Sequence, residues 1–231
     1  MTWVKICGTT NLADANAAIA AGADALGFIF APSPRQITQA AAAEIVDALP
    51  ANVRKVGVVV NESPENLARL AQNVGLTGVQ LHGDEPADQL WAYRSALRTR
   101  IIIKTLQASA LLAGGDDYLD SYLRVSKFFD AVLVDAGSPV RRGGTGVPFD
   151  WDAVSPLVSR IKETMPVIIA GGLSPENVAD AVRLLAPWGV DVVSGVESTT
   201  GKKEQSKLRA FVETVRAADA LGSSQRAALS V

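Results

Sequence analysis

The chain contains a single cysteine and a strand-end aspartate at positions where acid–base chemistry could occur. Cys7 ends the apolar run WVKIC (residues 3–7) directly before Gly8, and Asp135 follows the apolar run AVLV (131–134). A thiol with an ordinary pKa of about 8.5 and a carboxyl with one of about 3.9 both need tuning to transfer protons near neutral pH. We take Cys7 as a candidate general base and Asp135 as a candidate general acid. An inert buried thiol and a loop-capping carboxylate are the alternative interpretations.

Two further side chains follow predicted strands. Arg35 ends the segment FAPSPR, whose prolines would stiffen a loop, and a planar guanidinium is suited to bidentate binding of a carboxylate. His82 follows the apolar run GVQL (78–81). From the residues alone, a solvated loop arginine is the simpler interpretation of Arg35, and His82 could equally cap its strand.

Two glycine-containing loops occur late in the chain. Gly171 and Gly172 follow the run VIIA, and Ser194 and Gly195 follow VDVV. Glycine lets backbone N–H groups approach an anion closely, and the segment SPE (174–176) predicts a helix start whose dipole would add to the attraction. We predict a phosphate site between these two loops, with simple tight turns as the alternative.

The elements that must position these residues follow a regular pattern. Short apolar runs alternate with helical intervals eight times, at about 28 residues per unit. This alternation predicts one (β/α)8 TIM barrel, in which chemistry lies at the C-terminal ends of the strands and phosphate beside strands seven and eight. A doubly wound open sheet would normally carry its glycine-rich loop after the first strand, where this chain has only Gly8. We assign residues 1–221 to the barrel and 222–231 to a frayed tail.

Composition narrows the class of protein. The 231 residues are 48% hydrophobic, carry a net charge of −2 and include no long basic run, so nucleic acid is not an expected partner. No segment resembles a signal peptide or a membrane span. One cysteine cannot form an internal disulfide, which fits a cytoplasmic location. One histidine and one cysteine also exclude a His/Cys zinc cluster, and we expect no metal and no cofactor.

Lys5 is a charge within the otherwise apolar first strand. Side chains alternate along a strand, so Lys5 shares the inward face with Cys7, one layer deeper. A buried ammonium needs a carboxylate partner. Asp191, on the last strand, is the best candidate and Asp135 the second. The same positive charge could also favour the Cys7 thiolate.

The chain resembles the phosphoribosylanthranilate isomerase family. The shared motifs occur in order through all eight units: KICG (5–8), GFIFAPSPR (27–35), QLHGDE (80–85), VDAG (134–137), GGTG (143–146), FDW (149–151), AGGLSPENV (170–178) and DVVSGVE (191–197). The resemblance implies an isomerase of tryptophan biosynthesis that needs no cofactor. It would convert N-(5'-phosphoribosyl)anthranilate to 1-(2-carboxyphenylamino)-1-deoxyribulose 5-phosphate in an Amadori rearrangement.

The resemblance also implies roles for individual residues. Asp135 would protonate the furanose ring oxygen and so open the sugar to a Schiff base, and Cys7 as thiolate would then remove the proton from C2. The remaining expected contacts are Arg35 with the anthranilate carboxylate, His82, Gly144 and Asp191 with other parts of the substrate, and Gly171, Gly172, Ser194 and Gly195 with the phosphate. The expected partner is this small molecule, bound by a monomer or a homodimer.

Some positions depart from the family, and two other functions compete. Many relatives carry Ser where Val193 stands and Lys-Asp where Lys203 and Glu204 stand; we expect Val193 to alter packing rather than phosphate binding. A dual-substrate barrel isomerase that also serves histidine synthesis would carry Asp rather than Cys7. A catalytically silent barrel that only binds a phosphosugar or a partner protein is the third possibility, since fold alone does not establish activity.

Overall fold

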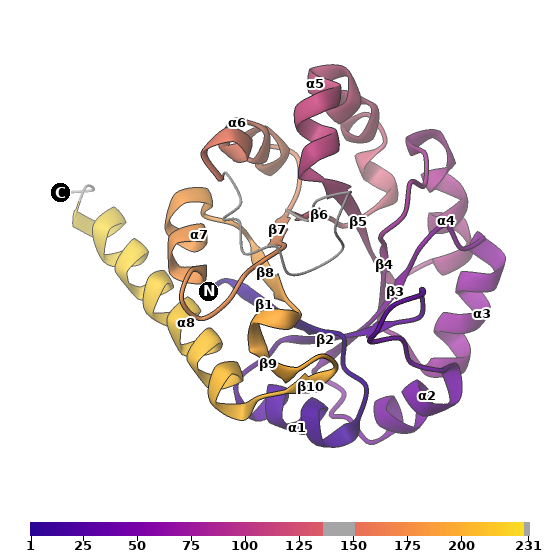
Figure 1. Cartoon of the computed structure of the whole chain (residues 1–231). Helices are drawn as coiled ribbons and strands as arrows, with labels where there is room; N and C mark the ends of the chain where they lie inside the picture. Colours follow the sequence, from indigo (N-terminus) through magenta and orange to yellow (C-terminus); the bar gives the residue numbers. More distant parts are fainter. Residues whose placement is uncertain (136–150, 229–231) are drawn as a thin grey trace.

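Eight parallel strands close into a barrel in sequence order, and helices surround it (Figure 1). The computed structural model describes residues 1–135 and 151–228, with side chains up to Leu221. The barrel strands are β1 (Trp3–Cys7), β2 (Ala25–Ile29), β3 (Arg54–Val59), β4 (Gly78–Leu81), β5 (Ile101–Gln107), β6 (Ala131–Asp135), β7 (Val167–Ala170) and β8 (Gly189–Val192). The predicted (β/α)8 barrel is confirmed, and the open sheet is wrong.

The α-helices follow the strands. They are α1 (Leu12–Ala20), α2 (Gln39–Asp47), α3 (Pro64–Val74), α4 (Leu90–Leu97), α5 (Ala108–Leu123), α6 (Trp151–Lys162), α7 (Val178–Leu185) and α8 (Gln205–Ala228). Short 3-10 turns η1 (Ala87–Gln89) and η2 (Ser126–Phe128) precede α4 and β6. None of these helices combines the length and the hydrophobicity needed to cross a membrane.

Local signals explain several helix boundaries. Asn11 caps α1 by accepting a hydrogen bond from the backbone N–H of Asp14, and Ser63 caps α3 in the same way with Pro64 at the first helical position. Gly75 ends α3 with a left-handed φ of 77°, which only glycine adopts without strain. The capping residues Asn11 and Ser63 thus explain where both helices start.

One predicted helix start is wrong. The segment 174–176 was expected to open a helix, but α7 begins at Val178. The Asn177 side chain accepts a hydrogen bond from the backbone N–H of Ser174 (2.8 Å) and donates one to the carbonyl oxygen of Gly172 (2.9 Å). Asparagine competes for the backbone in this way, and these bonds fold the segment into a turn before the helix.

The barrel closes through its first and last strands. Lys5 lies opposite Asp191 in the β1–β8 pairing, and Cys7 lies opposite Gly27 in the β1–β2 pairing. Small and branched apolar side chains fill the interior below the mouth, and a larger apolar layer packs between strands and helices. The interior members include Ala25, Val56, Ile103, Leu133 and Ile168. These packed layers hold the strand ends rigid.

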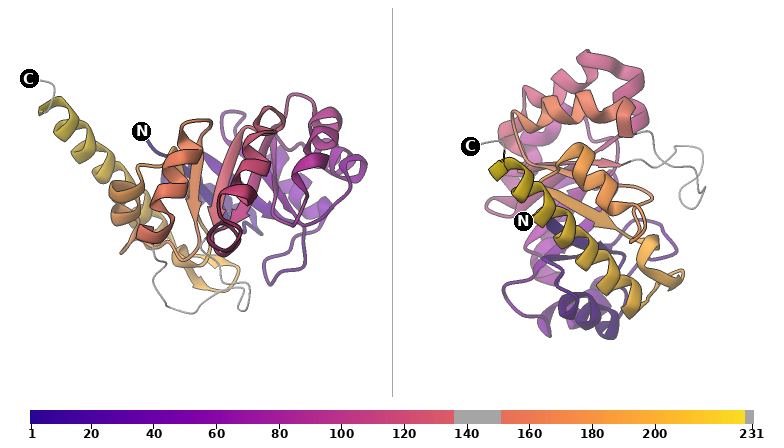
Figure 2. Two further views of the ribbon diagram at one scale, coloured as in Figure 1. Left: turned by 90° about the horizontal axis from the view of Figure 1, so that it is seen from above. Right: turned by 90° about the vertical axis from the view of Figure 1, so that its left-hand side faces the viewer.

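The chain after β8 contains elements that the sequence analysis missed. A 3-10 turn, η3 (Ser194–Val196), leads into a hairpin of β9 (Glu197–Thr199) and β10 (Lys202–Lys203), with Gly201 at a φ of 81° between its strands. Helix α8 then packs on α7 and α1 and projects beyond the barrel (Figure 2). The predicted tail at 222–231 overlaps the end of α8, and its fraying stays a prediction.

Candidate active site

The candidate catalytic residues lie at one end of the barrel. Cys7 is the last residue of β1, His82 follows β4 and Asp135 is the last residue of β6. Because the strands are parallel, their C-terminal ends share one mouth, so residues distant in sequence converge there (Figure 1). The predicted meeting of Cys7 and Asp135 at this mouth therefore follows from the closed topology.

The Cys7 thiol sits over a glycine on the neighbouring strand. A Cβ atom on Gly27 would lie only 2.5 Å from Cys7 Sγ, well inside van der Waals contact. Any larger residue at position 27 would displace the thiol. The side chain is also buried, with 3% of its surface exposed. Gly27, which the sequence analysis quoted only within a motif, therefore forms the seat of the thiol.

An ion pair inside the barrel lies beneath the thiol. Lys5 Nζ is 2.9 Å from Asp191 Oδ1, and the lysine is fully buried, which confirms the predicted pairing. Burial acts to lower the pKa of Lys5, but the attraction of Asp191 and Cys7 outweighs it and raises the pKa, so the ammonium keeps its charge.

The same charges act on Cys7 in opposite directions. Burial raises the pKa of the thiol, Lys5 lowers it, Asp191 raises it and Lys203 lowers it; the net direction is upward. The thiol therefore holds its proton at neutral pH. Lys5 and Lys203 are the groups that limit this rise, because a nearby positive charge favours a thiolate.

His82 and Asp135 face each other across the mouth. His82 Nε2 lies 3.4 Å from Asp135 Oδ2, while Gln80 Nε2 and Thr105 Oγ1 lie 3.0 and 3.2 Å from His82 Nδ1. Burial lowers the pKa of His82 more than Asp135 raises it, so the imidazole is neutral at pH 7. Since both neighbours of Nδ1 can donate, the hydrogen-bond network assigns the proton to Nε2, which faces Asp135.

A buried carboxylate anchors the loop that carries His82. Glu85 accepts hydrogen bonds from the backbone N–H groups of Asn61 (3.0 Å) and Gly83 (3.1 Å), and it pairs with Lys104 Nζ at 2.6 Å. Both charged side chains are 1% exposed, so the pair is shielded from solvent. Asn61, a strand-end residue in the sequence, accepts from the backbone N–H of Asp84 and holds this loop.

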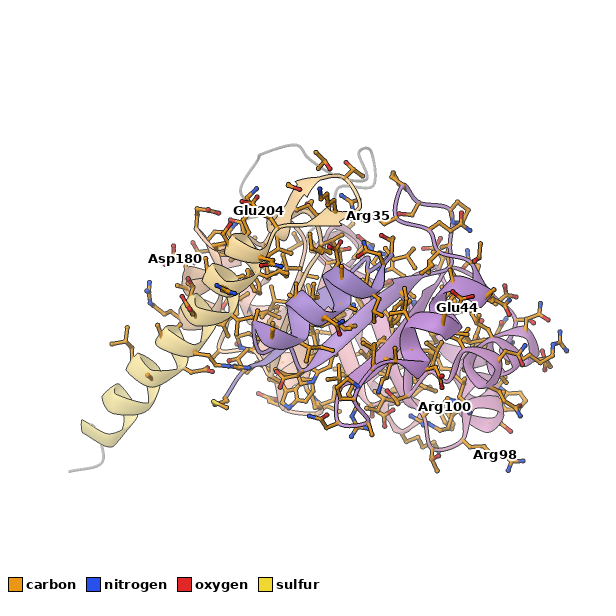
Figure 3. All side chains as sticks on the ribbon, turned by 90° about the horizontal axis from the view of Figure 1, so that it is seen from below. Arg35, Glu44, Arg98, Arg100, Asp180 and Glu204 are labelled. Carbon is orange, nitrogen blue, oxygen red and sulfur yellow. The ribbon has the colours of Figure 1, made fainter. Side chains whose placement is uncertain are left out.

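Arg35 makes a bidentate ion pair with Glu197 on the β9–β10 hairpin. The Nε–Oε1 and Nη2–Oε2 distances are 2.8 and 2.6 Å. Figure 3 shows Arg35 beside this hairpin, at the end of the barrel opposite Arg98 and Arg100. Lys203 Nζ also reaches Glu197 Oε1, at 3.1 Å. Sequence reasoning does not find Glu197 and Lys203 as site residues, because most of the hairpin between them is exposed and nothing in the sequence shows that these two side chains are buried.

The two glycine loops touch each other. Gly171 and Gly172 have left-handed φ values of 87° and 67°, and apart from its chain neighbours no described residue would place an atom within 4 Å of a Cβ on Gly172. A Cβ on Gly195 would lie 2.0 Å from the carbonyl oxygen of Leu173, so glycine is required where the loops meet. Ser194 is exposed beside this contact. The loops after β7 and β8 thus lie together as predicted, whereas Gly144 lies outside the described residues.

Known proteins resemble this chain over nearly its whole length. The family model for N-(5'phosphoribosyl)anthranilate (PRA) isomerase matches residues 4–214. The N-(5'-phosphoribosyl)anthranilate isomerase of Geotalea daltonii is 44% identical over 96% of this chain and 100% of its own, and that of Desulforudis audaxviator is 41% identical over 94% and 100%. The chain belongs to the N-(5'-phosphoribosyl)anthranilate isomerase family. Its reaction is the isomerisation of N-(5'-phosphoribosyl)anthranilate in tryptophan biosynthesis.

Solved structures of family members share the fold. The phosphoribosyl anthranilate isomerase from Thermotoga maritima superposes with a TM-score of 0.81 at 38% identity, over 94% of this chain and 100% of that one. The enzyme from Thermus thermophilus gives 0.76 at 35% identity, over 94% and 99%. The resemblance in sequence motifs is thus confirmed at the level of the family, its fold and its activity.

Replacing Lys5 in this isomerase tests whether the ion pair tunes the thiol. Lys5→Met removes a positive charge that favours the thiolate, so the pKa of Cys7 should rise further. The rate of alkylation by iodoacetamide against pH reports this pKa, and Cys7 is the single cysteine of the chain. Lys202→Met, at an exposed hairpin lysine, is the control. An unchanged Cys7 pKa in a folded Lys5→Met protein would mean that Lys5 only pairs with Asp191 inside the barrel and does not tune the thiol.

Proposed function

We propose that this isomerase works by general acid–base catalysis with Asp135 as acid and Cys7 as base. Asp135 donates a proton to the furanose ring oxygen as the bond from C1 to that oxygen breaks, and the anthranilate nitrogen forms the Schiff base with C1. Cys7, whose thiol must first release its proton to water, then takes the proton from C2 as the thiolate, and the electron pair of that C–H bond moves toward C1 and nitrogen to give an enolamine. Tautomerisation of the enolamine yields the ketose.

The observation that carries this proposal is the placement of one thiol and one carboxylate at the same barrel mouth, each beside a second polar side chain. Cys7 lies above Lys5, and Asp135 faces the neutral imidazole of His82. Lys5 supplies the charge that the thiolate needs, in opposition to the burial that holds the proton on the thiol. We propose that His82, whose Nε2 lies 3.4 Å from Asp135 Oδ2, orients the carboxyl and contacts the substrate.

The other groups of the substrate are assigned to residues whose charge or hydrogen-bonding groups complement them. Arg35 Nη1 has no hydrogen-bond partner among the described residues, so we assign the anthranilate carboxylate to that edge of the guanidinium. We assign the phosphate to the touching loops of Gly171, Gly172, Ser194 and Gly195. Asp191 binds Lys5 through Oδ1, which leaves Oδ2 for a sugar hydroxyl. Gly144 is proposed as a further contact.

Relatives support a small-molecule substrate and a simple assembly. One family structure, 36% identical with a TM-score of 0.77, is a complex with reduced 1-(o-carboxyphenylamino)-1-deoxyribulose 5-phosphate. Another, from Thermotoga maritima, contains monomers generated from the dimeric enzyme (35% identical, TM-score 0.77). We propose that this chain acts in the cytoplasm as a monomer or a homodimer, without nucleic-acid or membrane partners.

The function is tested by following the fluorescence of phosphoribosylanthranilate as the purified protein converts it. We expect the fluorescence to fall at a rate proportional to protein concentration. No conversion by folded protein would instead support the silent barrel.

Activity should survive exhaustive dialysis against EDTA. The proposed acid and base are protein side chains, which transfer protons without a Lewis acid. Nor does the part of the chain that the structure describes gather three or more His, Cys, Asp or Glu side chains into a metal site. The dialysed enzyme is assayed with and without added Mg²⁺ or Zn²⁺. Loss of activity that either ion restores would contradict the metal-independent mechanism.

A further inference from the structure

We propose that Glu197 is a positioning residue that aims Arg35 at the carboxylate of the substrate, and that Lys203 fixes this pair to the ends of β1 and β8. The inference rests on the proposed carboxylate role of Arg35 and assigns the selectivity of that contact to the β9–β10 hairpin. Neither Glu197 nor Lys203 is the proposed general acid or the proposed general base.

The hydrogen bonds around Lys203 join three parts of the mouth. Its Nζ donates to the carbonyl oxygen of Cys7 (2.6 Å), to that of Val193 (3.0 Å) and to Glu197 Oε1 (3.1 Å). An ammonium has three N–H donors, so all of them are used. The side chains of Lys203 and Glu197 are 1% and 4% exposed, and water therefore contributes little to their solvation. Lys203 thus ties Glu197 to the strand ends that carry the thiol and the phosphate loop.

The cluster of Arg35, Glu197 and Lys203 carries one net positive charge, which favours binding of an anion. One carboxylate, Glu197, faces two cations, Arg35 and Lys203. The attraction of these cations outweighs burial and lowers the pKa of Glu197, so the carboxylate stays ionised. A partly buried cluster with one net positive charge is stabilised by an incoming negative group. Since Lys203 has no free donor, that charge is presented by the guanidinium of Arg35.

Packing restrains the stem of Arg35 but not its head. Gly8 has a φ of 74°, and a Cβ there would lie 2.9 Å from Arg35 Cδ and 3.2 Å from Val193 Cγ1, so the stem runs closely over the loop after β1. Val193 lies beside the same glycine, and its role in packing rather than phosphate binding stays a prediction. The orientation of the planar head is then set by its fork with Glu197, which engages Nε and Nη2 and leaves Nη1 toward a ligand.

The hairpin itself is anchored, so Glu197 has a defined place. Lys203 donates its backbone N–H to Asp14 Oδ2 at 2.9 Å, Thr10 Oγ1 donates to the carbonyl oxygen of Gly201 at 3.1 Å, and Lys207 Nζ donates to that of Glu197 at 2.8 Å. These bonds connect the hairpin to the starts of α1 and α8. A positioning role requires such a rigid base, since a mobile carboxylate could not aim a guanidinium.

The test compares two ligands that differ only in the carboxylate. One is reduced 1-(o-carboxyphenylamino)-1-deoxyribulose 5-phosphate, and the other is its reduced anilino counterpart, which has a hydrogen in place of the carboxylate. Dissociation constants are measured for wild type, Glu197→Asp, Glu197→Gln and Arg35→Met. Glu197→Asp keeps the negative charge but has a side chain one methylene shorter. It therefore removes the bidentate pair with Arg35 without changing the net charge of the cluster. Glu44→Gln, at an exposed carboxylate of α2 (Figure 3), is the matched control.

We expect Glu197→Asp and Glu197→Gln to weaken binding of the carboxylate ligand by about tenfold or more, as loss of a charge-assisted contact does. Binding of the anilino ligand should change less than twofold, and Arg35→Met should abolish the difference between the ligands. Equal weakening of both ligands, or no weakening in Glu197→Asp, would overturn the inference. If the two ligands bind wild type equally, the carboxylate role of Arg35 itself fails.

Discussion

Cys7→Ser is expected to lower kcat/KM for phosphoribosylanthranilate by about 10²–10⁴-fold, the usual effect of losing a general base. A serine hydroxyl fits the space above Gly27 that the thiol occupies, so the barrel should remain folded. The hydroxyl, however, ionises at far higher pH than a thiol, and the charge of Lys5 cannot make up that difference. The fluorescence assay measures the loss, and the melting temperature reports the fold.

Turnover within a few-fold of wild type would remove Cys7 from the mechanism. Alkylation gives an independent check, because every modified molecule carries the label on Cys7, the single cysteine. Inactivation by iodoacetamide should proceed in step with labelling, and bound reduced product analogue should slow both. Labelling that leaves activity intact would contradict the base assignment in the unmutated protein.

Asp135→Asn is expected to reduce kcat by a similar factor, about 10²–10⁴-fold, because an amide cannot donate a proton to the ring oxygen. The amide has the shape of the carboxyl and can take the same place 3.4 Å from His82 Nε2, so the packing at the mouth should be kept. The loss should fall on kcat rather than KM, since the proton is transferred only as the ring opens. Steady-state kinetics with the fluorescent substrate separates the two constants.

The matched control for Asp135→Asn is Asp47→Asn, an exposed carboxylate at the end of α2. The same loss of one negative charge there should leave kcat unchanged. An Asp135→Asn enzyme with wild-type kcat would assign the acid role to another group. If Cys7→Ser were also fully active, the described mouth would hold neither proton-transfer residue.

Sequence reasoning predicts most of the barrel because its signals are local. Strands β1 and β4 lie where their apolar runs predict them, and α3 starts at its capping serine, Ser63. The Lys5–Asp191 pair is also predictable, although 186 positions separate its members, because alternation within strands and barrel closure together place both side chains inward.

The contacts that escape prediction depend on tertiary packing. Nothing near Glu197 in the sequence shows that it meets Arg35, 162 positions away, or that the hairpin buries Lys203. The role of Gly27 as the seat of the thiol depends on the register between β1 and β2. The start of α7 was mispredicted because the side chain of Asn177 competes with the helix for backbone groups, whereas the Ser-Pro pair is a purely local signal.

The pairing of β1 with β8 also determines when the barrel can close during synthesis of the chain. Lys5 emerges near the start of synthesis, but Asp191 lies in β8 and follows only after six further strands have been made. Until then the lysine has no buried partner and the edge of β1 stays open, so the nascent chain cannot reach the native interior. Closure therefore couples the ion pair, the seating of the thiol and the fit of the last strand into one late event, and we expect ribosome-bound chains shorter than about 200 residues to lack the mature site.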